Sequence, residues 1–353
     1  MRVLLSPLAR TVPTTTLDAD ALSALCAAAL AAAGARPADA ADTARVLVDA
    51  DAMGIATHGA IRVPGYARRL RSGGIDAHAA PRVEPRAPSL ALVDGAHALG
   101  PVVGVRALEA ALELARATGI AYVGCRRSNH FGALAPYALT ACDAGFVMLA
   151  GTNASSTMAP WGGAQARMGN NPLCVAAPAP DGRHFILDIA MSVAARGKIR
   201  AALAAGGQIP EGWALDRAGR PTTDPAAALD GLLQPLAAHK GSGLALAVDL
   251  LAGALTGARV LADVSSWVEH PDAPQGIGHF FVLLDPARLV GREAFAAALA
   301  RFRYLLQATP ALDPARPVHP PGDDLLARRA RSLAEGVSLP EALVSDLRAL
   351  ARG

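Results

Sequence analysis

A histidine and an arginine lie close together near the start of the chain, in a stretch that carries little other charge. This stretch, GIATHGAIRVPGY at residues 54–66, contains Thr57, His58 and Arg62. If the segment is helical, positions 58 and 62 share one face, so the imidazole and the guanidinium project side by side. Such a pair could hold a carboxylate next to a proton donor. Thr57 acting as a helix N-cap before two surface residues would give the same spacing.

Two more polar residues lie at or near the ends of apolar runs that are typical of inner strands. His130 stands in SNHFG, directly after the run GIAYVGC, and Asp188 stands inside the run FILDIAM. Strand ends often border clefts, so His130 is a candidate for a site, although a histidine satisfied by hydrogen bonds in a turn is an equal reading. A buried carboxylate is costly unless it is paired. Asp188 therefore pairs with an arginine or lysine, orients a catalytic histidine, or accepts from a ribose hydroxyl.

Two further segments could bind a cofactor. His239 and Lys240 enter a long predicted helix through Gly-Ser-Gly, and a cation at a helix N-terminus favours a phosphate. The loop-rich segment of residues 152–173, which contains Ser155 and Asn170, offers many amide and hydroxyl groups that could surround a nicotinamide, although ordinary turns share this composition.

The composition excludes several other classes of protein. The 353 residues are 52% hydrophobic and only 18% charged, with a net charge of +3 and 4% aromatic residues, so nucleic-acid binding has little support. The four cysteines are far apart and form no zinc or disulfide pattern, which fits a reducing cytoplasm. The apolar run within residues 1–16 is too short for a signal-peptide core, and the alanine-rich run near residue 30 is too short to span a membrane. We expect a cytoplasmic protein without a metal site.

The elements that must position these residues alternate between helix and strand. Helices are predicted over residues 16–34, 37–54, 58–70, 102–118 and 239–258, and three more follow residue 291. Buried strands are predicted at 89–95, 119–125, 146–153, 185–191 and 278–286, whereas residues 201–238 read as a long Gly/Pro/Asp-rich flap. No G-x-G-x-x-G follows the first strand, so a Rossmann site is not supported. No G-x-S-x-G elbow supports a hydrolytic triad of Thr57, His58 and Asp188, while a non-catalytic binding protein stays an open alternative.

Six segments in order carry a resemblance to a known family. They are ATHGAIRVPGY, SNHFGALAPYA, TNASSTMAPWGG, MGNNPLCVAAP, ILDIAMS followed by RGKI, and HKGSGLALAVDLLAGAL. With these segments the chain resembles the type-2 malate/L-lactate dehydrogenase family over residues 16–350. The resemblance implies a non-Rossmann α/β fold with a central mixed sheet, on which helical N- and C-terminal segments pack together. It also implies NADH or NADPH as cofactor, a small carboxylate substrate and a homodimer.

The resemblance also assigns roles to residues. The family's Ser-His-Gly becomes Thr57-His58-Gly59, Arg62 binds the substrate carboxylate, and the proton donor is His58 in some members and His130 in others. Asn170, which we expect to bind substrate with Arg62, stands where threonine is frequent, and Asp323 replaces a glutamate. These departures leave the substrate open between a 2-oxo acid and a cyclic imino acid. We expect His58 to be the proton donor, positioned by Thr57 and Asp188.

The remaining implications concern the cofactor and the domains. The cofactor-binding residues implied are His130, Phe131, Gly132, Ala133, Leu134, Ser155, Asp188, Ile189, Ala190, His239, Lys240, Pro321, Gly322 and Asp323. We expect residues 1–80 to form a helical segment joined by the C-terminal helices of residues 290–353, and residues 81–289 to form the central cofactor-binding domain.

Overall fold

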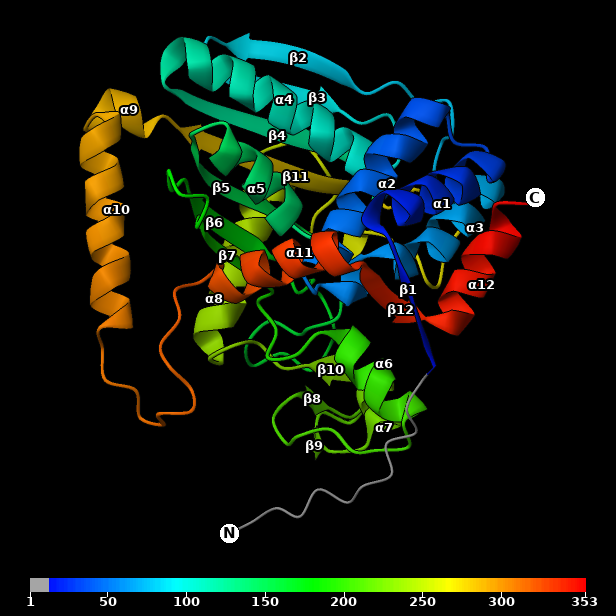
Figure 1. Cartoon of the computed structure of the whole chain (residues 1–353). Coiled ribbons are helices and arrows are strands. Elements are labelled where there is room, and N and C mark those ends of the chain that lie inside the picture. The colour runs from blue at the N-terminus through cyan, green and yellow to red at the C-terminus, as the bar shows by residue number, and fades with distance from the viewer. Residues whose placement is uncertain (1–12) are drawn as a thin grey trace.

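A seven-stranded mixed sheet forms the centre of the computed structural model, which describes residues 13–353 (Figure 1). The strand order is β2-β3-β4-β11-β5-β6-β7; β3 and β4 run parallel and all other neighbours antiparallel. The strands are β2 Arg82–Ala87, β3 Leu90–Asp94, β4 Ile120–Ser128, β5 Val147–Thr152, β6 Leu173–Ala177, β7 Phe185–Ile189 and β11 Ile277–Leu284. The α/β class with a mixed sheet is therefore confirmed. The N-terminal run considered as a signal peptide lies largely outside the described residues.

Helices cover both faces of this sheet, which explains why its central strands read as continuous apolar runs. Helices α4 (Gly100–Thr118) and α5 (Ala135–Asp143) pack on one face, and α8 (His239–Asp249) with the π-helical turn η3 (Leu250–Ala254) packs on the other. Val123 and Phe281, on the adjacent strands β4 and β11, are completely buried between these layers. Within residues 13–353, every helix is too short or too polar to cross a membrane.

The two ends of the described chain meet beside the sheet. Strand β1 (Thr14–Leu17) pairs antiparallel with β12 (Val337–Pro340), and the helices pack around this pair. These helices are α1 Ala19–Ala32, α2 Pro37–Ala52, α3 Val63–Ser72, α11 Asp323–Glu335 and α12 Glu341–Leu350. The predicted packing of terminal helices is thus confirmed. Helices α9 (Pro286–Leu289) and α10 (Arg292–Gln307) stand apart at the side of the sheet (Figure 1), and the boundaries at residues 80 and 290 stay a prediction.

Two predicted elements differ from the structure. The helix predicted from residue 58 begins only at Val63; before it, η1 (Ala56–His58) and η2 (Ala60–Arg62) are separate 3-10 turns. They are separated at Gly59, where an added Cβ would lie 2.0 Å from Oδ1 of Asp51, so the chain passes too close to α2 for any side chain. Oδ2 of Asp51 accepts the backbone N–H of Ala60 at 2.6 Å. This contact holds the turn in place.

The segment predicted as a flap is a small folded unit instead. It contains α6 (Arg196–Ala204), α7 (Pro225–Asp230) and a three-stranded sheet in the order β10-β8-β9. Its strands are β8 Ala214–Leu215, β9 Pro221–Thr222 and β10 Leu232–Leu233, and the 3-10 turn η4 (Leu261–Asp263) follows later in the chain. The strands are too short to give a period-2 pattern, which is why the sequence indicates only a loop.

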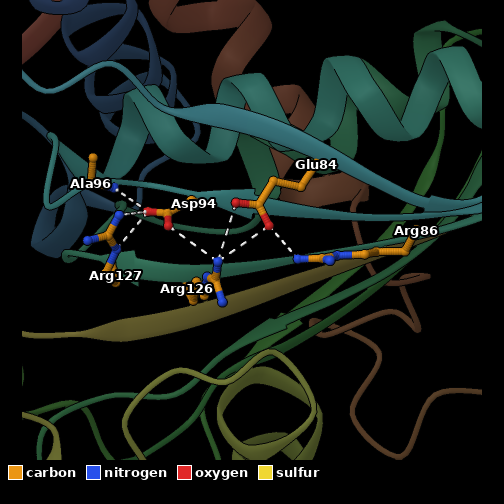
Figure 2. A network of polar contacts seen from close by, with 6 residues as sticks. All are labelled: Glu84, Arg86, Asp94, Ala96, Arg126 and Arg127. Carbon is orange, nitrogen blue, oxygen red and sulfur yellow. Dashed lines mark hydrogen bonds and ion pairs between the residues drawn. The ribbon is translucent and has the colours of Figure 1, made fainter.

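A charged network fixes the end of β4, which leads into the candidate site (Figure 2). Nε of Arg127 donates to Oδ1 of Asp94 at 2.7 Å, and Arg126 bridges Asp94 and Glu84 at 3.4 and 3.3 Å. Arg127 has a φ of 49°, in the left-handed region, and lies between Cys125 and Ser128, where the register of β4 against β11 shifts. The ion pairs therefore hold a strained turn, and this turn directs Asn129 and His130 away from the sheet.

Candidate active site

Two adjoining cavities bring the candidate residues together where β4 ends beneath the N-terminal segment. The inner cavity, of about 300 Å³, is lined by Ile55, Phe131, Gly132, Ala133, Leu134, Asn153, Asp188, Ala190, Ile277 and Leu325, among others. The arginine cavity, of about 200 Å³, is lined by Arg62, Thr157, Arg196, Gly197, Arg200 and Glu269, among others. Both walls share Thr57, His58, His130, Ser155, Asn170 and Trp267. Two histidines therefore stand at the junction of one apolar and one cationic space.

His58 and Arg62 are neighbours, but not through a helix. Nε of Arg62 donates to the backbone oxygen of Thr57 at 2.6 Å, and the guanidinium lies 5.4 Å from the ring centre of Trp267. Oγ1 of Thr57 lies 2.9 Å from Nδ1 of His58. The two 3-10 turns thus bring the guanidinium of Arg62 to the backbone oxygen of Thr57. The prediction differs, because it brings Arg62 and His58 together through the i to i+4 spacing of a helix.

His130 lies between two aromatic rings and has a defined tautomer. Its ring centre is 5.5 Å from that of His58 and 5.2 Å from that of Trp267. Oη of Tyr66 donates to the backbone oxygen of His130 at 3.0 Å, so the 2.7 Å contact between Oη and Nδ1 requires Nδ1–H as donor. Neutral His130 therefore presents Nε2 as an acceptor. For His58, the hydroxyl of Thr57 can donate to Nδ1, which leaves Nε2–H as a donor.

Burial keeps both imidazoles neutral. Burial first, and then the positive charge of Arg62, lower the pKa of His58 from 6.5 to about 3. The pKa of His130 is also well below its ordinary value, because of burial first and then of Arg62 and His58. The site thus combines a guanidinium with two uncharged rings.

A buried polar scaffold behind His130 was not found from the sequence. Oε1 of Gln275 accepts the backbone N–H of His130 at 3.0 Å and NH1 of Arg69 at 3.1 Å. NH2 of the same arginine donates to Oδ1 of Asn129 at 3.0 Å. Arg69 is completely buried. Its guanidinium therefore ties α3 to the loop that precedes β11, and these contacts fix the backbone beneath His130.

Asp188 lines the inner cavity, and its hydrogen bonds go to the backbone and not to His58. Its Oδ2 accepts the backbone N–H groups of Leu134 and Ala135, both at 2.9 Å, at the start of α5. Within the described residues, its carboxylate forms no ion pair and no hydrogen bond to a histidine. Burial raises its pKa to about 6, and the two backbone hydrogen bonds act against this shift. The carboxylate therefore anchors the loop of residues 131–134 to β7.

The predicted cofactor residues divide into two groups. Phe131, Gly132, Ala133, Leu134, Ser155, Asp188 and Ala190 line the inner cavity with His130, and their contact with a cofactor stays a prediction. Ile189, His239, Lys240, Pro321, Gly322 and Asp323 do not belong to the wall of either cavity. His239 and Lys240 are exposed at the start of α8, Asp323 pairs with Arg303 at 2.5 Å, and the oxygen of Pro321 accepts from Ile186 at 3.1 Å.

The inner cavity fits a planar amide-bearing ring. Ile55, Ile277 and Leu325 supply apolar walls, and Ser155 and Asn170 supply polar groups at the boundary with the arginine cavity. An apolar pocket with a few convergent polar groups is the usual form of a small-ligand site. The residues of this wall would hold a nicotinamide ring in a cavity that the two histidines also line.

Comparisons with known proteins were made for the whole chain. The family model described as malate/L-lactate dehydrogenase matches residues 17–348. The (2R)-3-sulfolactate dehydrogenase (NADP(+)) of Chromohalobacter salexigens is 40% identical over 328 residues, which cover 93% of this chain and 95% of that protein. The delta(1)-pyrroline-2-carboxylate reductase of Ancylobacter novellus is 37% identical over 329 residues, covering 92% and 94%. The crystal structure of a dehydrogenase from Sinorhizobium meliloti superposes with a TM-score of 0.88 at 36% identity, covering 96% and 99% of the two chains.

Proposed function

The chain belongs to the malate/L-lactate dehydrogenase family and is an NAD(P)-dependent oxidoreductase, and from this premise we propose that it interconverts a small 2-oxo acid and its 2-hydroxy acid. One observation carries the proposal. The half-buried guanidinium of Arg62, which forms no ion pair within the described residues, lies beside an imidazole that can present an N–H donor. These are the two groups that a 2-oxo acid requires, one for its carboxylate and one for its carbonyl oxygen.

Each residue has a defined task in this mechanism. Arg62 holds the substrate carboxylate through its terminal nitrogens, because its Nε is already bonded to Thr57. Thr57 holds Nδ1 of His58. With the anionic substrate bound, His58 takes up a proton from solvent. Nε2–H of this imidazolium donates a hydrogen bond to the carbonyl oxygen and delivers the proton as negative charge develops there, which leaves His58 neutral. His130, whose Nε2 is free as an acceptor in the neutral ring, lines the same cavities.

In this proposal the residues of the inner cavity would hold the cofactor. When bound, NADH or NADPH would supply the hydride that reduces C2 of the substrate. Phe131, Ser155, Asn170 and Ala190 would hold the nicotinamide, and Asp188 would keep the loop of residues 131–134 in position. The flat ring of Trp267, stacked on His130, excludes water from the reacting carbon.

Reduction of a cyclic imino acid is the second candidate. A relative named as a pyrroline-2-carboxylate reductase is 37% identical to this chain, and such a substrate also carries a carboxylate next to the carbon that receives hydride. In that reaction the C=N nitrogen takes the place of the carbonyl oxygen in front of His58.

A substrate panel tests the proposal. Purified enzyme is mixed with NADH or NADPH and with pyruvate, oxaloacetate, 3-sulfopyruvate, pyrroline-2-carboxylate or piperideine-2-carboxylate, and nicotinamide absorbance is followed. We expect turnover of 2-oxo acids that is abolished in His58→Gln. Turnover of imino acids alone would establish the second candidate, and turnover of neither class would refute both.

We also infer that the enzyme is a cytoplasmic homodimer. Along α8, η3 and the residue after it, Leu244, Leu250 and Leu255 are 47%, 59% and 59% exposed, and an exposed apolar row of this kind is typical of a subunit interface. The four free cysteines fit a reducing compartment. Sedimentation equilibrium should give twice the chain mass for the wild type and a lower mass for Leu250→Glu. An unchanged dimer in the variant would place the interface elsewhere.

A further inference from the structure

Three arginines border the arginine cavity without a carboxylate partner. They are Arg62 from η2 and Arg196 and Arg200 from α6. Among the ion pairs of residues 13–353, none includes any of the three. Glu269 is the single acidic residue in the wall, and it is exposed. The cavity therefore holds an excess of two positive charges.

The two arginines of α6 lie on the same side of their helix. Positions 196 and 200 are one turn apart, a spacing at which like charges repel and destabilise a helix. NH2 of Arg196 donates to the backbone oxygen of Leu229, while its Nε is buried without a hydrogen-bond partner. Burial, with a further contribution from Arg200, lowers the pKa of both Arg62 and Arg196. An anion between these guanidiniums would relieve that repulsion.

The start of α6 is pressed against the catalytic turn. An added Cβ on Gly197 would lie 2.8 Å from Cγ2 of Thr57, so the absence of a side chain at position 197 allows this approach. Ala195, the N-cap of α6, offers no side-chain hydrogen bond to the free N–H groups of the first turn. The positive end of the helix dipole therefore adds to the charge of the cavity.

On this basis we propose that Arg196 and Arg200 bind a second anionic group of the substrate, a carboxylate or a sulfonate carried on C3. The inference rests on the proposed function, in which Arg62 holds the carboxylate on C1. With C1 at Arg62 and the C2 oxygen at His58, the substituent on C3 is the remaining part of the molecule that can extend along the cavity toward α6. The enzyme therefore prefers dianionic 2-oxo acids over monoanionic ones.

A matched pair of substrates tests this inference. Oxaloacetate and 3-sulfopyruvate carry a carboxylate and a sulfonate on C3, whereas pyruvate carries hydrogen there. We expect the wild type to favour a dianion over pyruvate in kcat/KM by about 10- to 100-fold, as for one or two charge-assisted hydrogen bonds. Arg200→Gln should lower kcat/KM for the dianion at least about tenfold and leave pyruvate within about twofold. If Arg200→Gln lowers kcat/KM more for oxaloacetate, the site binds a carboxylate; if it lowers kcat/KM more for 3-sulfopyruvate, the site binds a sulfonate.

Two further variants make the result decisive. Arg200 is exposed, so its substitution should not disturb folding, and Lys198→Gln on the same helix is the control because exposed Lys198 does not line the cavity. Arg196→Lys keeps a charge but not the planar guanidinium, and should give an intermediate loss. Equal losses for the dianion and pyruvate, or a raised KM for NAD(P)H alone, would overturn the inference. In either case pyruvate reduction that depends on His58 would leave the proposed function standing, whereas failure to reduce any 2-oxo acid would refute both.

Discussion

Removing the guanidinium of Arg62 should weaken binding of the acid far more than binding of the cofactor. Nε is committed to the oxygen of Thr57 at 2.6 Å, so the two terminal nitrogens remain for the two oxygens of the substrate carboxylate. Two charge-assisted hydrogen bonds contribute ~1.5–3 kcal/mol each, or ~3–6 kcal/mol together. At ~1.4 kcal/mol for each factor of ten, Arg62→Ala should lower kcat/KM for the acid by about 10²- to 10⁴-fold.

The assay separates the two ligands. Initial rates are measured from nicotinamide absorbance, with the acid varied at saturating NAD(P)H and then the reverse. The KM for the acid should rise at least about 100-fold, and the KM for NAD(P)H should change by less than about threefold, because Arg62 lines only the arginine cavity. Arg68→Ala, an exposed arginine of α3, is the control for loss of charge.

Two additional measurements guard against a purely structural effect. The bond from Arg62 to Thr57 also supports the turn that carries His58, so Arg62→Ala could lower kcat by displacing the imidazole. Guanidinium ion added to the solution should restore part of the activity of Arg62→Ala if binding of the carboxylate is what was lost, and Arg62→Lys should be intermediate. Equal increases of KM for the acid and for NAD(P)H, with no rescue, would refute the carboxylate clamp.

Three more perturbations follow from the geometry. Because the pKa of His58 is about 3 in the free protein, kcat/KM for reduction should rise about tenfold for each unit that pH falls between pH 8 and 5; a pH–rate series that is flat over this range would exclude His58 as the donor. Burial raises the pKa of Asp51 from 3.8 to about 7, so its ionisation lowers stability by up to ~4 kcal/mol as pH rises through that interval; Asp51→Asn, which keeps an acceptor for Ala60, should flatten the pH dependence of the unfolding free energy in urea titrations. Gly59→Ala should displace the turn of His58 and Arg62, because its Cβ would lie 2.0 Å from Oδ1 of Asp51; we expect a loss of ~2 kcal/mol or more in thermal unfolding together with a large loss of kcat, and a variant with unchanged activity would show that the turn adapts.

The sequence was most informative about elements that bury one continuous surface. The apolar runs that form β4, β5, β7 and β11 are long enough to distinguish inner strands from loops. Gly34 likewise marks the end of α1. The error at residue 58 had a different origin. Gly59 and Ala60 break the helix through contacts with Asp51, a residue of the preceding helix. A tertiary contact of this kind leaves no periodic signal.

The candidate site was predictable only where chemistry is concentrated in short segments. His58 and His130 each lie in a short recognisable motif. In the structure their rings stack with their centres 5.5 Å apart. Tyr66 and Gln275, which fix His130, lie 64 and 145 positions away from it along the chain. Each looks ordinary within its own segment. Their roles arise from the meeting of α3, the end of β4 and the loop before β11, which local patterns do not encode.

The distribution of charge distinguishes the cavity from the rest of the protein. At the C-terminal end of β4, the carboxylates of Glu84 and Asp94 meet three arginines, and the network holds a strained turn (Figure 2). Around the arginine cavity, the guanidiniums converge without such partners, and the imidazole of His58 is kept neutral by burial and by Arg62. A half-buried cation without a counterion, such as Arg62 or Arg196, lowers the stability of the fold. An anionic substrate supplies the missing charge and, by reducing the repulsion from Arg62, also makes protonation of His58 easier. Binding of the acid and readiness to donate a proton are therefore coupled through the same guanidinium.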